Sequence, residues 1–523
     1  MLLAKTEKDK DTKLALLFIV ICAAILRIPN VFNGLPFFVQ VEEGLVNNVI
    51  LNLSISDLNP HDFIYPGLIY YLMLPIFSFF RFIFPHAMSG LNLGEFFSYI
   101  LLGRIVIVFL GLCSIVFLYR IGKRLFDPYT ALIAALFLAT DPMYVAWSSI
   151  FKPDMLMSTL IIVAFLFICR ISNTTDTKRT DYIFTGLFIG LATAAKYNAL
   201  ITVIPFLLVH LFNLKNKAHF MNKNLFLALF FMCLGFFIFN PFIILDSSTF
   251  LKDIKSELYR AKWGFPSDFI SDYRGWVRYP LIVTSVLGPG MLTLSICGLI
   301  LSMLRHTRNG ILILSFPLAY YLIMGAFRNS PAHYALPIIP FILLLAAKFL
   351  KDLIFSISKM GLFKKIKSTT AYLIILGSIL PSLYRSIYYI KWINQEDTKI
   401  LARDWMQANI PSGSRVLADI FSPDNPAGIP GVKANCNIST IKWREKLNYR
   451  DFFSKNNFDY IIIVCIEDRP LNEQQLYDYI NQRFLLIKEF KPRIKRPTSH
   501  FMYSPLYHST IRIYDGRKQK IAR

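Results

Sequence analysis

Long apolar stretches alternate with short polar segments through the first 390 residues of the chain. They cover residues 14–28, 100–122, 129–147, 155–171, 181–197, 199–213, 224–245, 280–304, 310–327, 333–351 and 369–390. A helix of about 20 mainly apolar residues is long enough to cross a bilayer. The pattern therefore predicts a mostly α-helical, polytopic membrane protein with about eleven transmembrane helices in a domain of residues 1–390.

Basic residues beside the apolar stretches predict their orientation. Four lysines precede the first stretch, so the positive-inside rule places the N-terminus in the cytoplasm. Residues 67–84 are also apolar, but counting them as a span would put the later basic clusters outside the cell. We therefore expect residues 61–98 to form juxtamembrane helices on the outer face, within a first outer loop of residues 33–98. A crossing by residues 67–84 stays open as the alternative.

The composition changes after residue 390, which predicts a second domain of residues 391–523. Helical patterns occur at residues 398–409 and 472–483, and strand patterns at residues 415–418, 460–464, 485–490 and 510–514. Such alternation favours a soluble α/β domain, and the orientation of the spans places it outside the cell. Cys436 and Cys465 lie in it, either as a disulfide or as two separate thiols.

Composition and charge support the membrane class. Of the 523 residues 55% are hydrophobic, and the net charge is +23. A chain this basic could bind nucleic acid, but its Lys and Arg residues form short clusters between apolar stretches, as cytoplasmic loops require. We expect a multi-pass cell-membrane protein that contacts membrane lipids and no nucleic acid.

Ionisable residues gather on the predicted outer face. They are Glu42, Glu43, His61, Asp62, Lys152, Asp154, Lys196, His333 and the basic residues of the loop 246–279, including Arg260 and Arg274. Charges at a membrane edge are costly and often functional, although simple interfacial solvation is the alternative. A carboxylate can deprotonate an acceptor hydroxyl, and Lys or Arg can stabilise a departing phosphate. This face therefore predicts a reaction site for group transfer.

Several of these segments resemble the GT-C fold glycosyltransferases of the protein O-mannosyltransferase and lipid A aminoarabinose transferase kind. The similar segments are Val41-Glu42-Glu43-Gly44, residues 58–68, Gly103-Arg104 with residues 121–126, Lys152-Pro153-Asp154, residues 186–197, residues 333–337 and Asp404-Trp405-Met406. Together they cover most of the chain in the order of that family. One position departs from the family, since Glu42 stands where an Asp is usual.

The resemblance implies an integral membrane glycosyltransferase that uses a polyprenyl-phosphate sugar as donor. Its acceptor would be a protein, a lipid or a glycan, and a single displacement would invert the anomeric carbon. A lipid or sugar transporter or flippase, or a non-catalytic member of the same fold, remains the alternative. No tightly bound cofactor is expected, and no His/Asp cluster has the spacing of metal ligands, so the role of a divalent metal stays open.

Residue roles follow from this comparison and from the chemistry. Glu42 is the expected general base with Glu43 as the second candidate, and Asp154 is expected to orient the acceptor or a basic residue. The expected substrate-binding residues are His61, Asp62, Tyr65, Lys152, Lys196, Tyr197, Arg260, Arg274, His333 and Tyr334. For the lysines the alternative is snorkelling to the interface, and for His61 and Asp62 it is a solvated turn.

Overall fold

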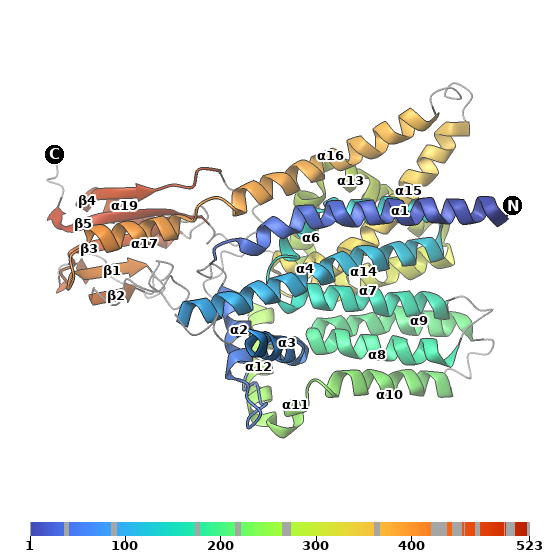
Figure 1. Cartoon of the computed structure of the whole chain (residues 1–523), viewed down its shortest axis with the longest axis horizontal. Coiled ribbons are helices and arrows are strands. Elements are labelled where there is room, and N and C mark those ends of the chain that lie inside the picture. The colour runs from blue at the N-terminus through green and yellow to red at the C-terminus, as the bar shows by residue number, and fades with distance from the viewer. Residues whose placement is uncertain are drawn as a thin grey trace.

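A computed structural model of the chain describes residues 2–35, 41–84, 92–172, 178–214, 221–263, 274–359, 367–419, 437–441, 452–453, 455–465, 471–495, 497 and 508–519. It has two regions (Figure 1). One is a body of helices that run roughly side by side, and the other is a unit with a β-sheet at one end of that body. The N-terminus lies at the opposite end.

Each predicted span overlaps a helix of the body. The helices are α1 (Leu2–Arg27), α4 (Asn92–Leu125), α5 (Pro128–Thr140), α6 (Pro142–Trp147), α7 (Pro153–Ile171), α8 (Arg179–Ala195), α9 (Val203–Asn213), α10 (Lys223–Phe237), α11 (Phe242–Leu245), α13 (Gly275–Arg305), α14 (Arg308–Met324), α15 (Ile339–Lys359) and α16 (Lys367–Ile393), with the 3-10 helices η1 (Ile28–Phe32), η3 (Tyr197–Thr202) and η5 (Ala332–Ile338). The mostly helical class is confirmed.

Helix length and composition identify the candidate membrane spans. Within the described ranges, five helical segments are long and apolar enough to cross a membrane: Lys10–Phe32, Tyr99–Leu125, Pro153–Ile171, Gly275–Arg305 and Tyr372–Asn409. Five shorter apolar helices accompany them: Leu68–Ile83, Pro128–Thr140, Tyr197–Asn213, Lys223–Phe237 and Arg308–Met324. Membrane insertion is thus supported, while the number of eleven spans stays a prediction.

The predicted span 129–147 forms two helices, and an Asp-Pro sequence begins each of them. Asp127 precedes α5, and its side chain accepts hydrogen bonds from the backbone N–H groups of Tyr129 and Thr130. Asp141 precedes α6 and accepts one from Tyr144. Both carboxylates satisfy N–H groups that have no partner inside the helix, and proline at the first helical position suits this boundary. The chain therefore restarts a helix at Asp141 instead of continuing straight.

Polar residues gather at two opposite ends of the helical body. At one end, Asn309 Nδ2 donates to the Leu125 carbonyl at 2.7 Å and Lys351 Nζ lies 3.5 Å from Asp127 Oδ2. At the other, Arg104 of α4 pairs with Glu43. Arg104 and Leu125 are separated by about 30 Å of helix at 1.5 Å per residue, which matches the apolar thickness of a bilayer. Which end faces the cytoplasm stays a prediction.

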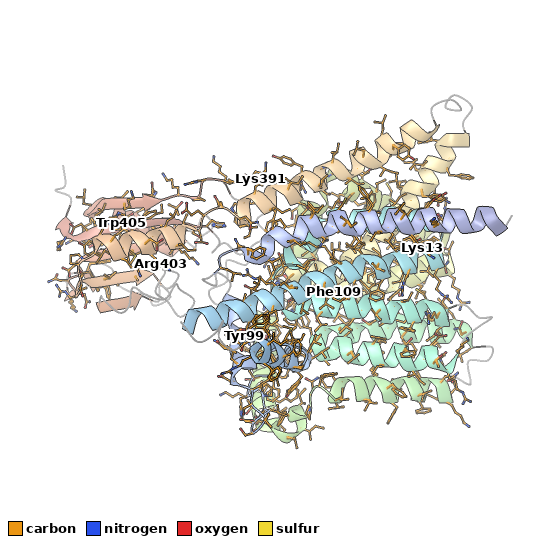
Figure 2. All side chains as sticks on the ribbon, viewed as in Figure 1. Lys13, Tyr99, Phe109, Lys391, Arg403 and Trp405 are labelled. Carbon is orange, nitrogen blue, oxygen red and sulfur yellow. The ribbon has the colours of Figure 1, made fainter. Side chains whose placement is uncertain are left out.

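Helices α2 (Val41–Asn52), α3 (Leu68–Ile83) and α12 (Ser247–Trp263) lie together at the end of the body nearer the sheet (Figure 1). Before α3, the Gly67 N–H donates to Asn240 Oδ1 at 2.7 Å, and inside α3 the Phe77 ring stacks on Tyr99 at 4.4 Å. Figure 2 places Tyr99 at this end of the body and Lys13 toward the other. The contacts of α3 therefore place residues 67–84 at the end of the body nearer the sheet. Their position on the outer face stays a prediction, and a crossing stays the alternative.

The strands form one five-stranded sheet in the order β2-β1-β3-β5-β4. They are β1 (Arg415–Asp419), β2 (Asn437–Ile441), β3 (Tyr460–Cys465), β4 (Phe484–Phe490) and β5 (Thr510–Gln519), with β1 parallel to β2 and β3, and β5 antiparallel to β3 and β4. Helix α17 (Thr398–Asn409) packs on one face through Met406 and α19 (Leu471–Arg483) on the other through Ile480. Because both faces are covered, β3 is apolar throughout.

The predicted helices and strands of residues 391–523 are confirmed, and β2 is an additional strand that the sequence pattern did not indicate. The extracytoplasmic position and the domain boundary at residue 390 stay predictions. Cys436 falls outside the described residues, so the disulfide with Cys465 also stays one.

Candidate active site

Three interruptions of helical structure meet at the end of the body near the sheet. Lys152 is the extended residue before α7, followed by Pro153. Lys196 is the extended residue after α8, where the chain turns into η3. His333 lies in η5, before α15. Each interruption places an ionisable side chain at this end of the helical body and not on the sides that face lipid.

These residues surround Asp154 in the first turn of α7. Lys196 Nζ donates to Asp154 Oδ1 at 2.6 Å, while Lys152 Nζ lies 3.9 Å from Oδ2 and His333 Nε2 lies 3.9 Å from Oδ1. Lys152, Asp154, Lys196 and His333 are together called the Asp154 cluster. Lys152 is 1% exposed and Lys196 7%, so both ammonium groups are buried and do not reach solvent as snorkelling lysines do.

Aromatic rings form the walls of the Asp154 cluster. Lys152 Nζ lies 5.3 Å from the Trp147 ring, which is in turn 4.7 Å from the His333 ring. Lys196 Nζ lies 4.3 Å from the Tyr334 ring and 5.8 Å from the Tyr65 ring. Aromatic faces attract cations and exclude water from around them. The rings therefore shield both ammonium groups from bulk solvent.

Buried polar atoms around the Asp154 cluster lack a hydrogen-bond partner. Within the described structure these include Asp154 Oδ2, Trp147 Nε1, Asn198 Oδ1 and the Tyr279 hydroxyl. Asn198 Nδ2 donates to the Tyr320 hydroxyl at 2.6 Å, and Tyr320 lies within electrostatic range of Asp154 and Tyr279. Such unsatisfied groups are rare in folded proteins and need an explanation. A bound polar ligand would satisfy several of them.

The Asp154 cluster brings several basic side chains close to one carboxylate. Lys152 and Lys196 carry two positive charges against the one carboxylate of Asp154, and Arg278 lies close enough to act electrostatically on His333. Buried ammonium groups are stabilised by groups of opposite charge and by hydrogen-bond acceptors. The arrangement therefore suits an anion that carries hydrogen-bond acceptors.

Glu43 and Arg104 form a second buried group beside it. Arg104 Nε donates to Glu43 Oε1 at 2.9 Å and Arg104 Nη2 to Oε2 at 2.6 Å, while Arg104 Nη1 donates to the carbonyls of Val31 and Asn33. The Phe151 N–H donates to Glu43 Oε1 at 2.7 Å. Glu43 thus joins α2 to α4 and to the residue that precedes Lys152.

Glu42 lies next to Glu43 in the backbone of α2, and its side chain falls outside the described residues. Its predicted role as general base is therefore untested. The role of Glu43 as the second candidate is untested too, although both of its oxygens already accept hydrogen bonds.

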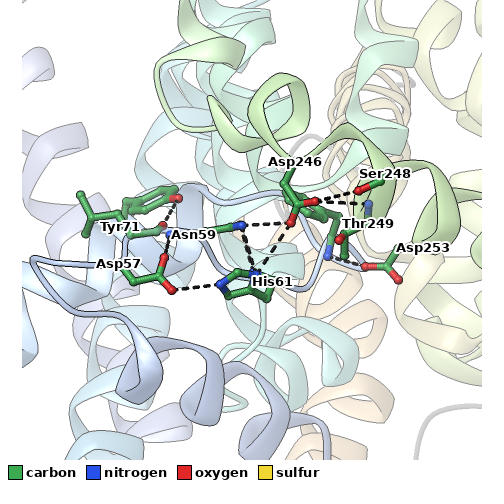
Figure 3. A network of polar contacts seen from close by, with 10 residues as sticks. Asp57, Asn59, His61, Tyr71, Asp246, Ser248, Thr249 and Asp253 are labelled. Atoms are coloured by element: carbon green, nitrogen blue, oxygen red, sulfur yellow. Dashed lines mark hydrogen bonds and ion pairs between the residues drawn. The ribbon is translucent and has the colours of Figure 1, made fainter.

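His61 belongs to a separate polar network (Figure 3). Its Nε2 lies 3.0 Å from Asp57 Oδ2, and its Nδ1 lies 3.8 Å from Asp246 Oδ2, which also accepts from Asn59 Nδ2 at 2.9 Å. The hydrogen bond with His61 lowers the pKa of the exposed Asp57. Asp253 Oδ2 accepts from the Phe63 N–H at 3.0 Å. This network ties residues 57–63 to α12 and its preceding residue.

The other predicted substrate-binding residues spread along the same end. Tyr197 donates to the Phe63 carbonyl at 3.1 Å, and Asp62 Oδ1 accepts from the Ile64 N–H, with burial raising the pKa of Asp62. Arg260 pairs with Glu257 in α12 and acts electrostatically on Asp62. Arg274 lies before α13, 5.9 Å from the Trp276 ring. Tyr65 and Tyr334, also among the predicted residues, place their rings beside Lys196.

Residues around the site that were not assigned a role from the sequence include Trp147, Arg104, Asn198, Tyr279 and Tyr320. Arg278 is one of the basic residues of the loop 246–279 from which phosphate binding was expected. Arg104 carried a signal, because a lone arginine inside an apolar stretch is costly without a partner. Among the described residues, no three His, Cys, Asp or Glu side chains are grouped to hold a metal ion; the expectation of no tightly bound metal stays a prediction.

Comparison with known proteins identifies relatives of this fold. The sequence profile of the family described as dolichyl-phosphate-mannose-protein mannosyltransferase matches residues 97–244, which contain Arg104, Lys152, Asp154 and Lys196. No curated protein matches the sequence.

Three solved structures of two proteins are similar over most of the chain. ArnT from Cupriavidus metallidurans in the apo state has a TM-score of 0.57 at 12% identity, with 97% of this chain and 98% of that chain covered. The same protein bound to undecaprenyl phosphate has a TM-score of 0.55 at 13% identity over 96% and 98%. The Archaeoglobus fulgidus oligosaccharyltransferase AglB, in complex with an inhibitory peptide and a dolichol-phosphate, has a TM-score of 0.53 at 14% identity over 93% and 74%. The chain has their GT-C fold, which confirms the resemblance predicted from its motifs.

Proposed function

We propose that the chain is an integral membrane glycosyltransferase that moves a sugar from a polyprenyl-phosphate donor to an acceptor hydroxyl at the Asp154 cluster. The observation that carries the proposal is the grouping of the buried Lys152 and Lys196 ammonium groups around Asp154, beside two buried donors, Trp147 Nε1 and the Tyr279 hydroxyl, that have no hydrogen-bond partner. Proteins of the same fold support it, since one was solved with undecaprenyl phosphate and another with a dolichol-phosphate.

The donor phosphate binds between the two lysines. Asp154 fixes the Lys196 ammonium by a 2.6 Å hydrogen bond, and its other oxygen accepts no hydrogen bond and lies 3.9 Å from Lys152 Nζ. Trp147 Nε1 and the Tyr279 hydroxyl supply further donors for phosphate or sugar oxygens. Charged donors arranged before the reaction stabilise the charge that develops on the leaving phosphate.

Glu42 is the general base in this proposal. It takes the proton of the acceptor hydroxyl while that oxygen forms a bond to the anomeric carbon, and the bond from this carbon to the phosphate oxygen breaks. The electron pair leaves with the polyprenyl phosphate, so no nucleotide is required. Glu43 acts as a positioning residue, because its bonds to Arg104 and Phe151 hold α2 beside the residue before Lys152.

The polyprenyl tail lies in the membrane beside the end of the helical body that carries the Asp154 cluster. On α3, Phe79 is 65% exposed and Phe82 is 83% exposed, which gives an apolar surface at that end. Burial of a lipid chain contributes about 0.8 kcal/mol per CH₂. The tail would therefore supply affinity, and the lysines would supply recognition of the phosphate.

Purified protein with a radiolabelled polyprenyl-phosphate sugar and a mixture of acceptors tests the proposal. Label transferred to an acceptor supports a glycosyltransferase. Movement of the donor across a vesicle membrane without transfer would indicate a flippase instead. Donor binding without transfer or movement would indicate a non-catalytic member of the fold.

A further inference from the structure

A cavity of about 350 Å³ lies at the end of the helical body opposite the Asp154 cluster. Its lining includes Ser302, Arg305 and Arg308 around the α13–α14 connection, and Lys348, Phe349 and Asp352 of α15. Arg278 lies in the first turn of α13, near His333, and Arg305 is the last residue of this 31-residue helix, which is kinked at Gly288. The cavity is thus distinct from the candidate active site, and its volume is in the range of small-molecule sites.

The lining of the cavity is positively charged. Lys348 Nζ lies 2.6 Å from both oxygens of Asp352, so this pair is internally neutral. Arg305 Nη1 reaches Asp352 Oδ2 at 3.4 Å, yet its side chain is 56% exposed. Arg308 Nη2 donates to Asn213 Oδ1, and its buried Nε has no hydrogen-bond partner. Two positive charges therefore remain for an anion.

The N-terminus of α14 adds to the positive potential in the cavity. Thr307 precedes the helix, and its side chain accepts from the Gly310 N–H at 3.2 Å. Both residues line the cavity. The helix has 17 residues, and the N-terminus of a helix carries a partial positive charge that favours anions.

Apolar residues of α13 continue from the rim of the cavity. Ile300 is 51% exposed, Met303 46% and Leu304 71%, and they alternate with the lining residues Leu301, Ser302 and Arg305. A basic cavity that adjoins an exposed apolar helix surface suits a ligand with an anionic head and apolar chains. A soluble anion has no apolar part to bind the exposed apolar surface of α13.

We propose that this cavity binds the phosphate of an anionic phospholipid from the membrane leaflet at that end. Arg305 and Arg308 contact the phosphate, and the acyl chains lie along Ile300, Met303 and Leu304. The ion pair between Arg305 of α13 and Asp352 of α15 holds the two helices beside each other at this site. The site does not depend on the proposed transfer activity. The shared chemistry is a phosphate ester, and free phosphate esters are the other possible source.

Titration of phosphatidylglycerol into the detergent-solubilised full chain, followed by native mass spectrometry, measures the affinity of the first bound lipid. In R305Q/R308Q we expect an affinity for phosphatidylglycerol about thirtyfold lower, from about 1 kcal/mol for each basic residue near a lipid headgroup. Binding of neutral phosphatidylcholine should not change. The matched control is R120Q/K223Q, which removes two exposed basic residues outside the cavity.

A second variant keeps every charge. Ser302→Phe places a ring in the cavity, so it should reduce phosphatidylglycerol binding as strongly as the arginine variant. It decides the matter if R305Q/R308Q does not fold. Equal losses in R120Q/K223Q, or full binding in Ser302→Phe, would overturn the proposal in favour of diffuse surface charge. Glycerol 3-phosphate that binds in the absence of lipid as tightly as phosphatidylglycerol would overturn the lipid as the source.

Discussion

The two ends of the helical body both collect basic residues, but they hold them differently. In the Asp154 cluster, Lys152 and Lys196 are buried between aromatic rings and share one carboxylate. At the opposite cavity, Arg305 is 56% exposed beside a lysine that is already paired with Asp352. Buried charge demands a specific partner, whereas exposed charge is solvated and screened. The comparison predicts a selective substrate site at one end and a tolerant lipid site at the other.

The largest effect is expected from Glu42→Gln, which tests whether the transfer reaction takes place only at the end of the body that carries the Asp154 cluster. The amide keeps the size of the side chain but cannot take the acceptor proton, so transfer should fall by about 10² to 10⁴ while donor binding is retained. The control is Asp478→Asn, an exposed carboxylate of α19. Full activity in Glu42→Gln together with a dead Glu43→Gln would move the base to Glu43.

Arg104→Met tests how much the buried ion pair between Arg104 and Glu43 contributes to stability at the same end of the body. It leaves Glu43 buried without its charged partner, which should lower the free energy of unfolding by about 3 to 5 kcal/mol. The double variant E43L/R104M removes both charges and should recover most of that loss. Chemical unfolding in detergent measures both. A double variant as unstable as the single one would show that burial of charge is not the cause.

Tyr334→Leu sharpens the role of the aromatic walls. Loss of the ring 4.3 Å from Lys196 Nζ should weaken donor binding about two- to thirtyfold, the range of a cation–π contact. Tyr334→Phe keeps the ring and should bind the donor as the unchanged protein does. If the phenylalanine variant loses as much as the leucine variant, the hydroxyl matters and the ring does not.

The smallest expected effect is a difference in salt dependence between ligand binding at the two ends of the body. Between about 0.1 and about 1 M salt the screening length falls from about 10 to about 3 Å. Phosphatidylglycerol binding at the exposed Arg305 and half-buried Arg308 should weaken about tenfold, and donor binding at the buried lysines less than about threefold. Equal salt dependence in lipid titrations at both sites would contradict the difference in burial.

Local sequence features predicted most of the elements. Apolar stretches marked the helices because burial and membrane insertion both require them, and the turn at Pro411 with the apolar run at residues 460–464 indicated an α/β unit. Strand β2 (Asn437–Ile441) is short and contains Asn, Ser and Thr, so it carried no apolar pattern. Its place at the edge of the sheet comes from pairing with β1.

The candidate site could be predicted in part. Lys152, Lys196 and His333 each lie at a boundary of an apolar stretch, so one orientation rule assigned them to a common face. Contacts between distant residues could not be found in this way. Arg104 is 61 residues from Glu43 in sequence, and only the packing of α2 against α4 reveals that the two charges neutralise each other.

Recognition of the donor phosphate by the buried lysines is the central claim, and one binding measurement tests it directly. Polyprenyl phosphate and the neutral polyprenol are compared on Lys152→Met, on D154N/K196M and on the exposed control Lys223→Met. Each site variant should bind polyprenyl phosphate about ten- to a hundredfold more weakly, equivalent to about 1.5 to 3 kcal/mol for a hydrogen bond to a charged group, and should bind polyprenol unchanged. Small and equal losses for both lipids in both site variants would contradict the assignment of Lys152 and Lys196 to the phosphate.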